Sequence, residues 1–366
     1  MARTKSTAGK LSMDDMRKLI NKRAGYSVAH NLREGNPTEV KEWIPTGSRW
    51  LDSIICRGKL AGIPVGKIVE IAGLEASGKS YMAAQIAANA QKMGIDVVYF
   101  DSESAIDPTF LERAGCDLEN LLYVQAQSVE FVLETIEDLL GGGNKYLFIW
   151  DSLALTPAIS DVEGDFNPQS SMAVKARILS KGMSKLTVPI ANSQSTFLVL
   201  NQLKANITRS PSEALVTPYM TPGGKAMIYS YSLRIWLTRR KAKASFINDE
   251  NGFRIGNEVR VKLEKSRFGT QGRQCNFKIM WGDEIGVQDE ESWYDAIKGS
   301  DYIKSSGSWC SLVYEDGTEE KFQPSRWSEK IVNEKFRARV LELIDREVIL
   351  KFDKREGTAA DFYEEE

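Results

Sequence analysis

The strongest constraint on the fold is the octapeptide GLEASGKS at residues 73–80, which fits the phosphate-loop pattern. It has glycine at its first and sixth places and closes with Lys79 and Ser80. The strand-like run KIVEIA precedes it, and the helix-like run SYMAAQIAANAQKMG follows and ends at Gly94. This context disfavours a chance match in a glycine-rich turn. It is typical of an open α/β sheet.

Strand-like and helix-like segments continue to alternate after this loop. The runs DVVYFDSE, LLYVQA, KYLFIWDS and TFLVLNQ read as strands, and the longest helix is expected at about residues 172–186. This alternation predicts a mostly parallel sheet with helices on both faces. A polar segment at 203–224 then precedes LRIWLTRR, FRIGNEVRVKLEKSR and RQCNFKIMWG, which are spaced like antiparallel hairpins. The predicted fold class is therefore α/β with an antiparallel extension of the sheet.

Smaller regions are expected on either side of this core. The predicted regions are an N-terminal arm (1–40), the core (41–286), a small α+β domain (287–355) and an acidic tail (356–366). The arm contains a short predicted helix at 12–24, and residues 1–33 carry eight Lys or Arg against two Asp. A strongly charged helix is expected near 325–351. Charge asymmetry of this kind is typical of interaction arms.

Composition excludes some classes of protein. The net charge is −2, so overall charge does not indicate a nucleic-acid partner. The four cysteines form no C-x-x-C pair, which argues against a zinc site and for free thiols in a reducing compartment. We see no secretory signal and no apolar run near the roughly 18 residues of a membrane span, so we expect a cytosolic protein.

The phosphate loop has a defined chemistry. Its backbone N–H groups curl around phosphate oxygens, the following helix adds the positive end of its dipole, and Lys79 adds a point charge. The expected nucleotide-binding residues are Gly73, Leu74, Glu75, Ala76, Ser77, Gly78, Lys79 and Ser80. The Ser80 hydroxyl can reach Mg²⁺, and Asp151, at the tip of the strand YLFIWD, is its expected partner at the metal. Asp151 could instead cap the next segment.

Hydrolysis also requires a group that positions water. Glu103 ends the strand VVYFDSE at the carboxyl edge of the sheet, where open sheets place ligands. A glutamate there can accept a proton from water or orient it. Asp101 competes for this role, and periodicity alone does not choose between the two.

Several runs together resemble the RecA recombinases. They are PTGSRWLDSIICRGKLAGIPVGKIVEIAGLEASGKS, DSESAIDPTFLERAGCDLENLLYVQ, IWDSLALTP, and LNQLK followed by TPGGKA, and they match the family's order and spacing over about residues 41–286. SGSWCSLVYEDG resembles the family's ending more loosely. Leu74, where the family usually has proline, and a lengthened loop are typical of a diverged member, such as a phage-encoded recombinase of the UvsX type. The resemblance implies a RecA-type ATPase core.

The resemblance also implies ATP and Mg²⁺ as cofactors and a role for individual residues. The implied catalytic residues are Lys79, Glu103, Gln202, Lys265 and Arg267. The implied adenine contacts are Asp107, Phe110 and Trp281. Glu103 would activate water, and Gln202 would sense the γ-phosphate. Lys265 and Arg267 would reach ATP on the adjacent subunit, and Trp281 would lie near that neighbour's adenine; ordinary strand chemistry is the alternative for these three.

Two loops, at 161–173 and 203–224, would bind DNA in such a protein. The implied DNA-binding residues are Phe166, Met172, Lys175, Arg177, Lys204, Arg209, Tyr219, Gly223, Gly224 and Lys225. Flexible polar backbone and basic side chains suit phosphates, while aromatic and methionine side chains suit bases. Taken singly, each basic residue is better explained as a solvated surface charge, so the interpretation rests on the two loops together.

The implied function is an ATP-dependent DNA recombinase that forms helical filaments on single-stranded DNA and exchanges strands with a homologous duplex. Its arm would dock on the next subunit, and Tyr229 lies where the family has an interface aromatic. The acidic tail would compete with DNA, and single-strand-binding and mediator proteins would be further partners. The alternatives are another RecA-fold motor, such as a helicase or RadA-like repair factor, a non-catalytic DNA-binding mediator, or a kinase. No second phosphate loop, zinc-finger cysteines or kinase lid is visible to support them.

Overall fold

The computed structural model describes residues 11–25, 27–34, 38–104, 106–163, 171–206, 218–239, 245–281 and 285–349. The chain divides into two units, Met1–Lys41 and Glu42–Glu366, and each is described by itself. Among the described residues, no helix is long and apolar enough to cross a membrane.

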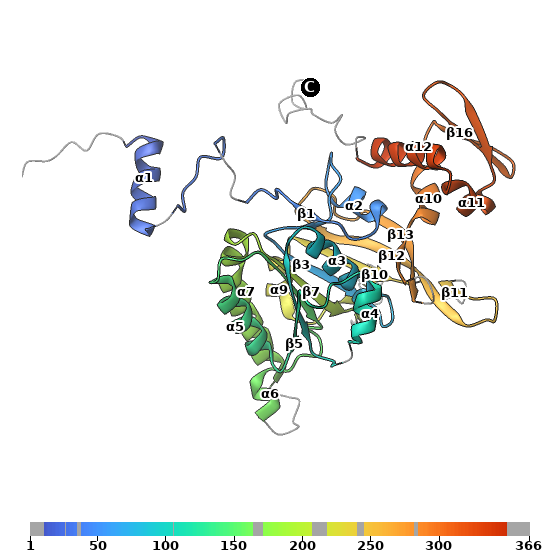
Figure 1. Cartoon of the computed structure of the whole chain (residues 1–366). Helices are drawn as coiled ribbons and strands as arrows, with labels where there is room; N and C mark the ends of the chain where they lie inside the picture. Colours follow the sequence, from blue (N-terminus) through green and yellow to red (C-terminus); the bar gives the residue numbers. More distant parts are fainter. Residues whose placement is uncertain are drawn as a thin grey trace, which may run out of the picture. The chain divides into compact units, whose positions relative to one another are not determined.

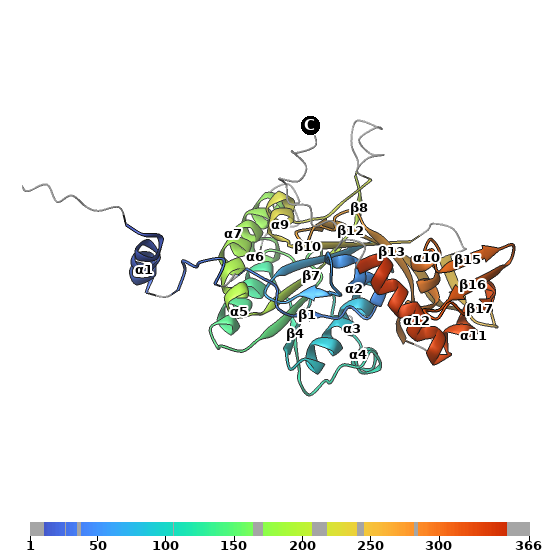
Figure 2. The ribbon, with the colours of Figure 1, turned by 90° about the horizontal axis from the view of Figure 1, so that it is seen from above.

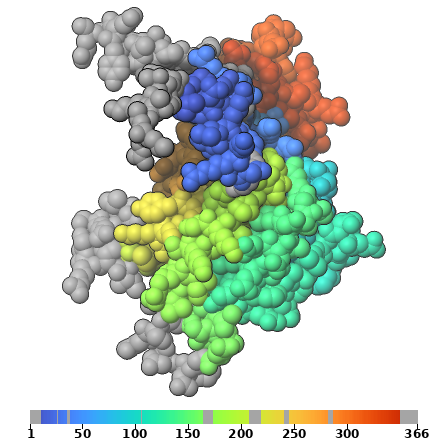
Figure 3. Space-filling view, turned by 90° about the vertical axis from the view of Figure 1, so that its left-hand side faces the viewer, coloured from blue at the N-terminus to red at the C-terminus, as the bar shows by residue number. Residues whose placement is uncertain are grey.

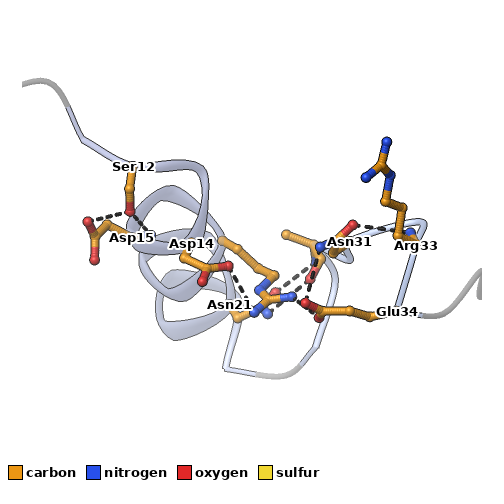
Figure 4. Close-up of polar contacts among 9 residues, drawn as sticks. Ser12, Asp14, Asp15, Asn21, Asn31, Arg33 and Glu34 are labelled. Atoms are coloured by element: carbon orange, nitrogen blue, oxygen red, sulfur yellow. Dashed lines mark hydrogen bonds and ion pairs between the residues drawn. The ribbon is translucent and has the colours of Figure 1, made fainter.

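The N-terminal unit contains the predicted helix, α1 (Met13–Ala24) (Figure 1). Ser12 caps it by accepting a 3.1 Å hydrogen bond from the backbone N–H of Asp15, and Gly25 ends it in the left-handed conformation. The Asn21 side chain accepts from the backbone N–H groups of Val28 and Ala29, which folds the following segment back along the helix (Figure 4). The helix buries none of its side chains within this unit. Its apolar stripe is therefore available to another surface.

Within the described part of the second unit, ten strands form the main sheet, in the order β14-β13-β12-β10-β3-β7-β6-β4-β5, with β11 paired to β12. The strands are β3 (Ile68–Gly73), β4 (Asp96–Asp101), β5 (Leu121–Gln125), β6 (Tyr146–Asp151), β7 (Thr196–Gln202), β10 (Leu233–Thr238), β11 (Phe246–Asn248), β12 (Arg254–Ser266), β13 (Gln274–Trp281) and β14 (Ile285–Gln288). Pairings are parallel from β10 to β5 and antiparallel from β10 to β14. The predicted parallel sheet with an antiparallel extension is confirmed.

Helices cover both faces of this sheet (Figures 1 and 2). They are α2 (Arg49–Ile55), α3 (Lys79–Lys92), α4 (Pro108–Arg113), α5 (Val129–Leu140), α7 (Ser171–Asn192) and α9 (Gly224–Ser230), while the short α6 (Ile159–Glu163) buries none of its residues. Apolar residues of α2 and α3 belong to one core, and those of α5, α7 and α9 belong to another. In Figure 3 the second helical layer, green to yellow, forms a continuous surface. Small pairs β1 (Trp43–Ile44) with β2 (Ile63–Pro64), and β8 (Lys204–Ala205) with β9 (Tyr219–Met220), lie outside the main sheet.

Helix α7 is longer than the sequence predicted. The predicted end at residue 186 lies three residues before Pro189, a residue that usually stops a helix because it lacks a backbone donor. The helix nevertheless continues to Asn192, and Ile190 in its last turn is fully buried in the core. Tertiary packing of Ile190 therefore outweighs the local preference.

The C-terminal region is a small α+β structure whose apolar residues continue the core beneath α2 and α3. Its elements are η2 (Glu290–Ser292), α10 (Trp293–Ile297), β15 (Ile303–Ser306), β16 (Trp309–Val313), β17 (Glu319–Phe322), η3 (Pro324–Arg326), α11 (Trp327–Ile331), α12 (Glu334–Ile344) and η4 (Asp345–Ile349). The prediction of a single helix near 325–351 was wrong. Asn333 caps a new helix by accepting from the backbone N–H of Phe336 at 3.0 Å, which divides the segment.

Candidate functional site

A pocket of about 670 Å³ lies where the parallel strands β3, β6 and β7 end. Its lining residues are Glu75, Ala76, Ser77, Gly78, Lys79, Ser80, Tyr81, Glu103, Asp151, Gln202, Leu203 and Trp281. The structure thus brings together most of the residues that the sequence marked as nucleotide-binding or catalytic. The carboxyl edge of an open sheet is the usual place for such a site.

The phosphate loop forms a cradle at the start of α3. Gly78 has φ +87°, and a Cβ atom there would lie 2.4 Å from Cδ1 of Ile279, so both backbone conformation and space require glycine. Gly73 is equally confined, because a Cβ atom would lie 2.2 Å from Oγ of Ser77. The first N–H groups of α3 have no partner within the helix and face the site where the loop ends. This arrangement suits an anion such as a phosphate.

Lys79 lies within the cradle and is partly buried. Its Nζ donates to the carbonyl oxygens of Leu74 at 3.2 Å and Gly73 at 3.5 Å. Burial lowers the pKa of the Lys79 ammonium, while Asp151 and Glu103 act in the opposite direction. A partly desolvated ammonium held only by neutral carbonyls gains most from a phosphate oxygen.

Ser80 and Asp151 meet on the pocket floor. The Ser80 hydroxyl donates to Oδ2 of Asp151 at 2.8 Å, and the Tyr99 hydroxyl, from β4, donates to the same oxygen at 2.8 Å. Burial raises the pKa of Asp151, and these two hydrogen bonds oppose the rise. Among the described residues no three acidic, histidine or cysteine side chains gather around a metal position. Ser80 and Asp151 nevertheless fit Mg²⁺, which usually keeps water and phosphate ligands beside one or two protein oxygens.

The structure separates the roles of Asp101 and Glu103. Asp101 is buried, and its carboxylate accepts from the backbone N–H groups of Glu103, Ser104 and Ile106 at 2.8, 3.0 and 3.3 Å. It therefore shapes the turn that carries Glu103. Glu103 lines the pocket and accepts a long hydrogen bond, 3.4 Å, from Oγ of Ser152. Burial and the nearby Asp151 raise the pKa of Glu103, which strengthens it as a base.

Aromatic rings form one wall of the pocket. Tyr81 lies 4.5 Å from Phe110 and 6.3 Å from Trp281, measured between ring centroids. The sequence placed Trp281 near a neighbouring chain's adenine, whereas the structure places it on the wall of the chain's own pocket. Sequence reasoning missed Tyr81, although it directly follows the phosphate loop.

Asp107 has a structural partner at the start of α4. Its side chain accepts a 2.9 Å hydrogen bond from the backbone N–H of Thr109 and caps the helix. Asp107 and Phe110 are outside the set of residues that line the pocket. Phe110 reaches the site through its contact with Tyr81.

Lys265 and Arg267 lie at the opposite end of the sheet's strands from the phosphate loop. Lys265 pairs with Arg234 near the start of β10, whereas the phosphate loop follows the end of the parallel neighbour β3. Nζ of Lys265 donates to the carbonyl oxygen of Ile228 at 2.7 Å, and Arg267 donates to that of Tyr229 at 2.9 Å. Neither cation can therefore serve its own chain's pocket, and Tyr229 beside them is 69% exposed.

The predicted DNA-binding residues are only partly described. Phe166, Arg209 and the side chain of Met172 lie outside the described residues. Lys204 and Tyr219 lie on the paired strands β8 and β9, while Gly223, Gly224 and Lys225 lie at the start of α9. The exposed Arg177 lies on α7, and its Nε donates to the carbonyl oxygen of Ala173 at 3.4 Å.

Lys175 is held by the backbone near the first of these loops. Its Nζ donates to the carbonyl oxygens of Thr156 and Leu153 at 2.6 and 2.9 Å. Burial lowers the pKa of this ammonium. In this conformation Lys175 fixes the turn after β6, and a DNA phosphate would have to compete with these carbonyls.

Comparisons with known proteins agree with the fold. A model of the RecA N-terminal domain matches residues 12–286. The chain is 32% identical to Protein RecA of Bifidobacterium breve over 300 residues, which cover 82% of this chain and 72% of that protein. It is 34% identical to Protein RecA of Rubrobacter xylanophilus over 266 residues, 73% of each chain. The chain therefore belongs to the RecA family of ATP-dependent DNA recombinases.

Proposed function

We propose that this chain binds ATP and Mg²⁺ in the pocket beneath the phosphate loop and hydrolyses ATP within a helical filament on single-stranded DNA. One observation carries the proposal. Glu103 lines the pocket at the carboxyl ends of the parallel strands, whereas Lys265 and Arg267 lie at the other end of these strands. A complete site then requires two chains in head-to-tail contact. Repeated contacts of this kind produce an open helical polymer.

Each residue of the pocket has a distinct task in this proposal. The α3 N-terminus and Lys79 bind the phosphates, and Ser80 and Asp151 hold Mg²⁺, which would neutralise charge on the phosphate oxygens. Glu103 orients the attacking water and accepts its proton. Tyr81 and Trp281 offer apolar surface to the base.

Lys265 and Arg267 would complete the site of the neighbouring chain. Both side chains are aimed at the carboxyl end of α9, where they are held by carbonyl oxygens. A cation supplied by a neighbour stabilises charge on the transferred phosphoryl group, so hydrolysis would depend on filament contact. Loss of the γ-phosphate would in turn weaken that contact.

Single-stranded DNA would bind along the segments that follow β6 and β7. The paired strands β8 and β9 place exposed Lys204 directly opposite Met220, which is 52% exposed, so a cation and an apolar side chain lie at one place. A cation binds the phosphate backbone of a single strand without sequence preference. Base pairing with a homologous duplex would then select the sequence, and strand exchange would follow.

The shared site can be tested by mixing two inactive variants. Glu103→Ala removes the base, and Arg267→Ala removes a cation given to the neighbour. In a random one-to-one mixture about a quarter of the head-to-tail interfaces would be intact, so about a quarter of the wild-type DNA-stimulated turnover should return. A mixture with no recovery, from variants that still form filaments by electron microscopy, would contradict a site shared between chains. Lys79→Ala in place of Glu103→Ala should behave in the same way.

A further inference from the structure

A buried ion pair lies in the sheet beneath the pocket. Nε of Arg234, on β10, donates to Oε2 of Glu70, on the adjacent strand β3, at 2.6 Å. Glu70 is fully buried and Arg234 is 5% exposed. Neither residue lines the pocket, and the roles proposed above use neither of them.

The ion pair holds both ends of the segment that follows β7. Oε1 of Glu70 accepts a 3.0 Å hydrogen bond from the side-chain amide of Asn201, which precedes Gln202. Nη2 of Arg234 donates to the Thr221 hydroxyl at 2.9 Å. The same Asn201 amide also donates to the carbonyl oxygen of Pro222 at 3.0 Å. Glu70 and Arg234 thus connect the entry of the segment with its exit before α9.

Gln202 is attached directly to this network. Its backbone N–H donates to Oδ1 of Asn201 at 2.9 Å, so the Asn201 side chain is bonded at both its oxygen and its nitrogen. Gln202 itself lines the pocket. A shift of Gln202 toward or away from a bound phosphate therefore strains bonds to Glu70 and Pro222.

We propose that Glu70 and Arg234 are positioning residues that transmit the state of the nucleotide pocket to the segment at 203–224. The proposal rests on the function proposed above, because it assigns DNA binding to that segment. The planar, forked guanidinium of Arg234 is central to this role, because it donates to Glu70 and to Thr221 at the same time. The ammonium of a lysine is a single point charge and cannot occupy both positions.

The stability of the folded chain alone gives little reason for the charges of Glu70 and Arg234 inside the sheet. A buried ion pair is often replaced by apolar residues of similar size without loss of stability, whereas removing one partner leaves an unpaired buried charge. A double variant, Glu70→Leu with Arg234→Met, therefore separates positioning from stability. Arg234→Lys provides a second variant, which keeps the charge opposite Glu70 but loses the bond to Thr221.

The test uses the full-length chain and three measurements. Hydrogen exchange at 201–206 and 218–230 is measured with and without a slowly hydrolysed ATP analogue, together with the affinity for a fluorescent ADP and the stimulation of ATP turnover by single-stranded DNA. We expect both variants to bind ADP within about twofold of wild type. We expect the nucleotide-dependent change in exchange, and the stimulation by DNA, to fall roughly tenfold.

The outcomes separate this proposal from the proposed function. Full nucleotide-dependent protection in either folded variant, or no such change in the wild type, would overturn the positioning role. A wild type that shows the change in exchange but no stimulation by DNA would overturn the assignment of the segment to DNA and leave the network standing. Lys185→Ala, which removes the exposed ion pair with Glu137, should match the wild type in every measurement.

Discussion

The Tyr99 hydroxyl donates a 2.8 Å hydrogen bond to Oδ2 of Asp151 from the neighbouring strand of the sheet. Tyr99 is fully buried, so its hydroxyl has no access to water and is committed to this carboxylate. The bond fixes the direction of Asp151 and supports its ionised form at the bottom of the pocket.

Replacing this hydroxyl should weaken the proposed binding of Mg²⁺. In Tyr99→Phe the ring still fills the core, but Asp151 loses a donor that holds it in position. Because Asp151 is a proposed ligand of Mg²⁺, loss of the hydrogen bond that orients it should lower the affinity for Mg²⁺ by about tenfold. A titration of Mg²⁺ against binding of a fluorescent nucleotide measures this directly. Tyr123→Phe is the matched control, because Tyr123 donates to Asp101 instead, and a Tyr99→Phe titration that coincides with it would contradict the prediction.

Glu103 and Asp101 should respond differently to the same chemical change. Glu103→Gln should reduce DNA-stimulated ATP turnover by roughly 100-fold or more and leave thermal unfolding unchanged, because a base is lost and no buried contact is broken. Asp101→Asn should destabilise the chain by about 1–3 kcal/mol, because an NH₂ donor replaces Oδ2, which accepts from the Ile106 N–H and the Tyr123 hydroxyl. Turnover assays and thermal unfolding of both variants measure these effects. Equal turnover by Glu103→Gln and the wild type would exclude Glu103 as the base.

Lys265 should make turnover sensitive to alkaline pH. Burial, together with the nearby Arg267 and Arg234, lowers the pKa of Lys265 to about 8. Since this value lies below the ordinary 10.5, burying the charged ammonium costs stability at neutral pH, and that cost is relieved as the pH rises from about 8 to 10.5.

The same titration removes a cation from the proposed contact with the neighbour's phosphates. Because a neighbouring phosphate favours the charged ammonium, turnover should fall at a pH above about 8, whereas Lys265→Arg should keep its activity there because arginine stays charged. A pH series of DNA-stimulated turnover for both proteins provides the comparison. Superimposable profiles would show that Lys265 is not the group responsible.

Asn333 should contribute measurably to the C-terminal region. Asn333→Ala removes the side-chain acceptor that caps α12 and should lower the free energy of unfolding by about 1 kcal/mol. Urea unfolding followed by tryptophan fluorescence measures the change. Asn333→Asp keeps a capping oxygen and should restore most of the stability, and an equal loss in both variants would assign the effect to something other than the cap.

Local sequence patterns predicted the sheet and most of the pocket. Gly73 and Gly78 are required by local backbone geometry, and the parallel strands bring Glu103, Asp151 and Gln202 to one edge whatever the details of packing. These residues were accessible to sequence reasoning because Asp151 and Gln202 end recognisable strands and Glu103 follows one closely.

Contacts between distant residues were not predictable in the same way. The bond between Glu70 and Arg234 joins residues 164 positions apart, and it depends on the register of β3 against β10. The Tyr99 hydroxyl likewise finds Asp151 only after β4 and β6 are paired. Choosing Glu103 over Asp101 required the backbone bonds that occupy Asp101.

The phosphate loop lies at one end of the parallel strands, and Lys265 and Arg267 lie at the other end. A head-to-tail row of these chains would therefore have two chemically different ends. One terminal chain would keep an incomplete hydrolytic centre, and the other would present cations with no triphosphate to meet. Subunits would then be gained and lost at different rates at the two ends, so the folding of a single molecule would give the proposed polymer a direction.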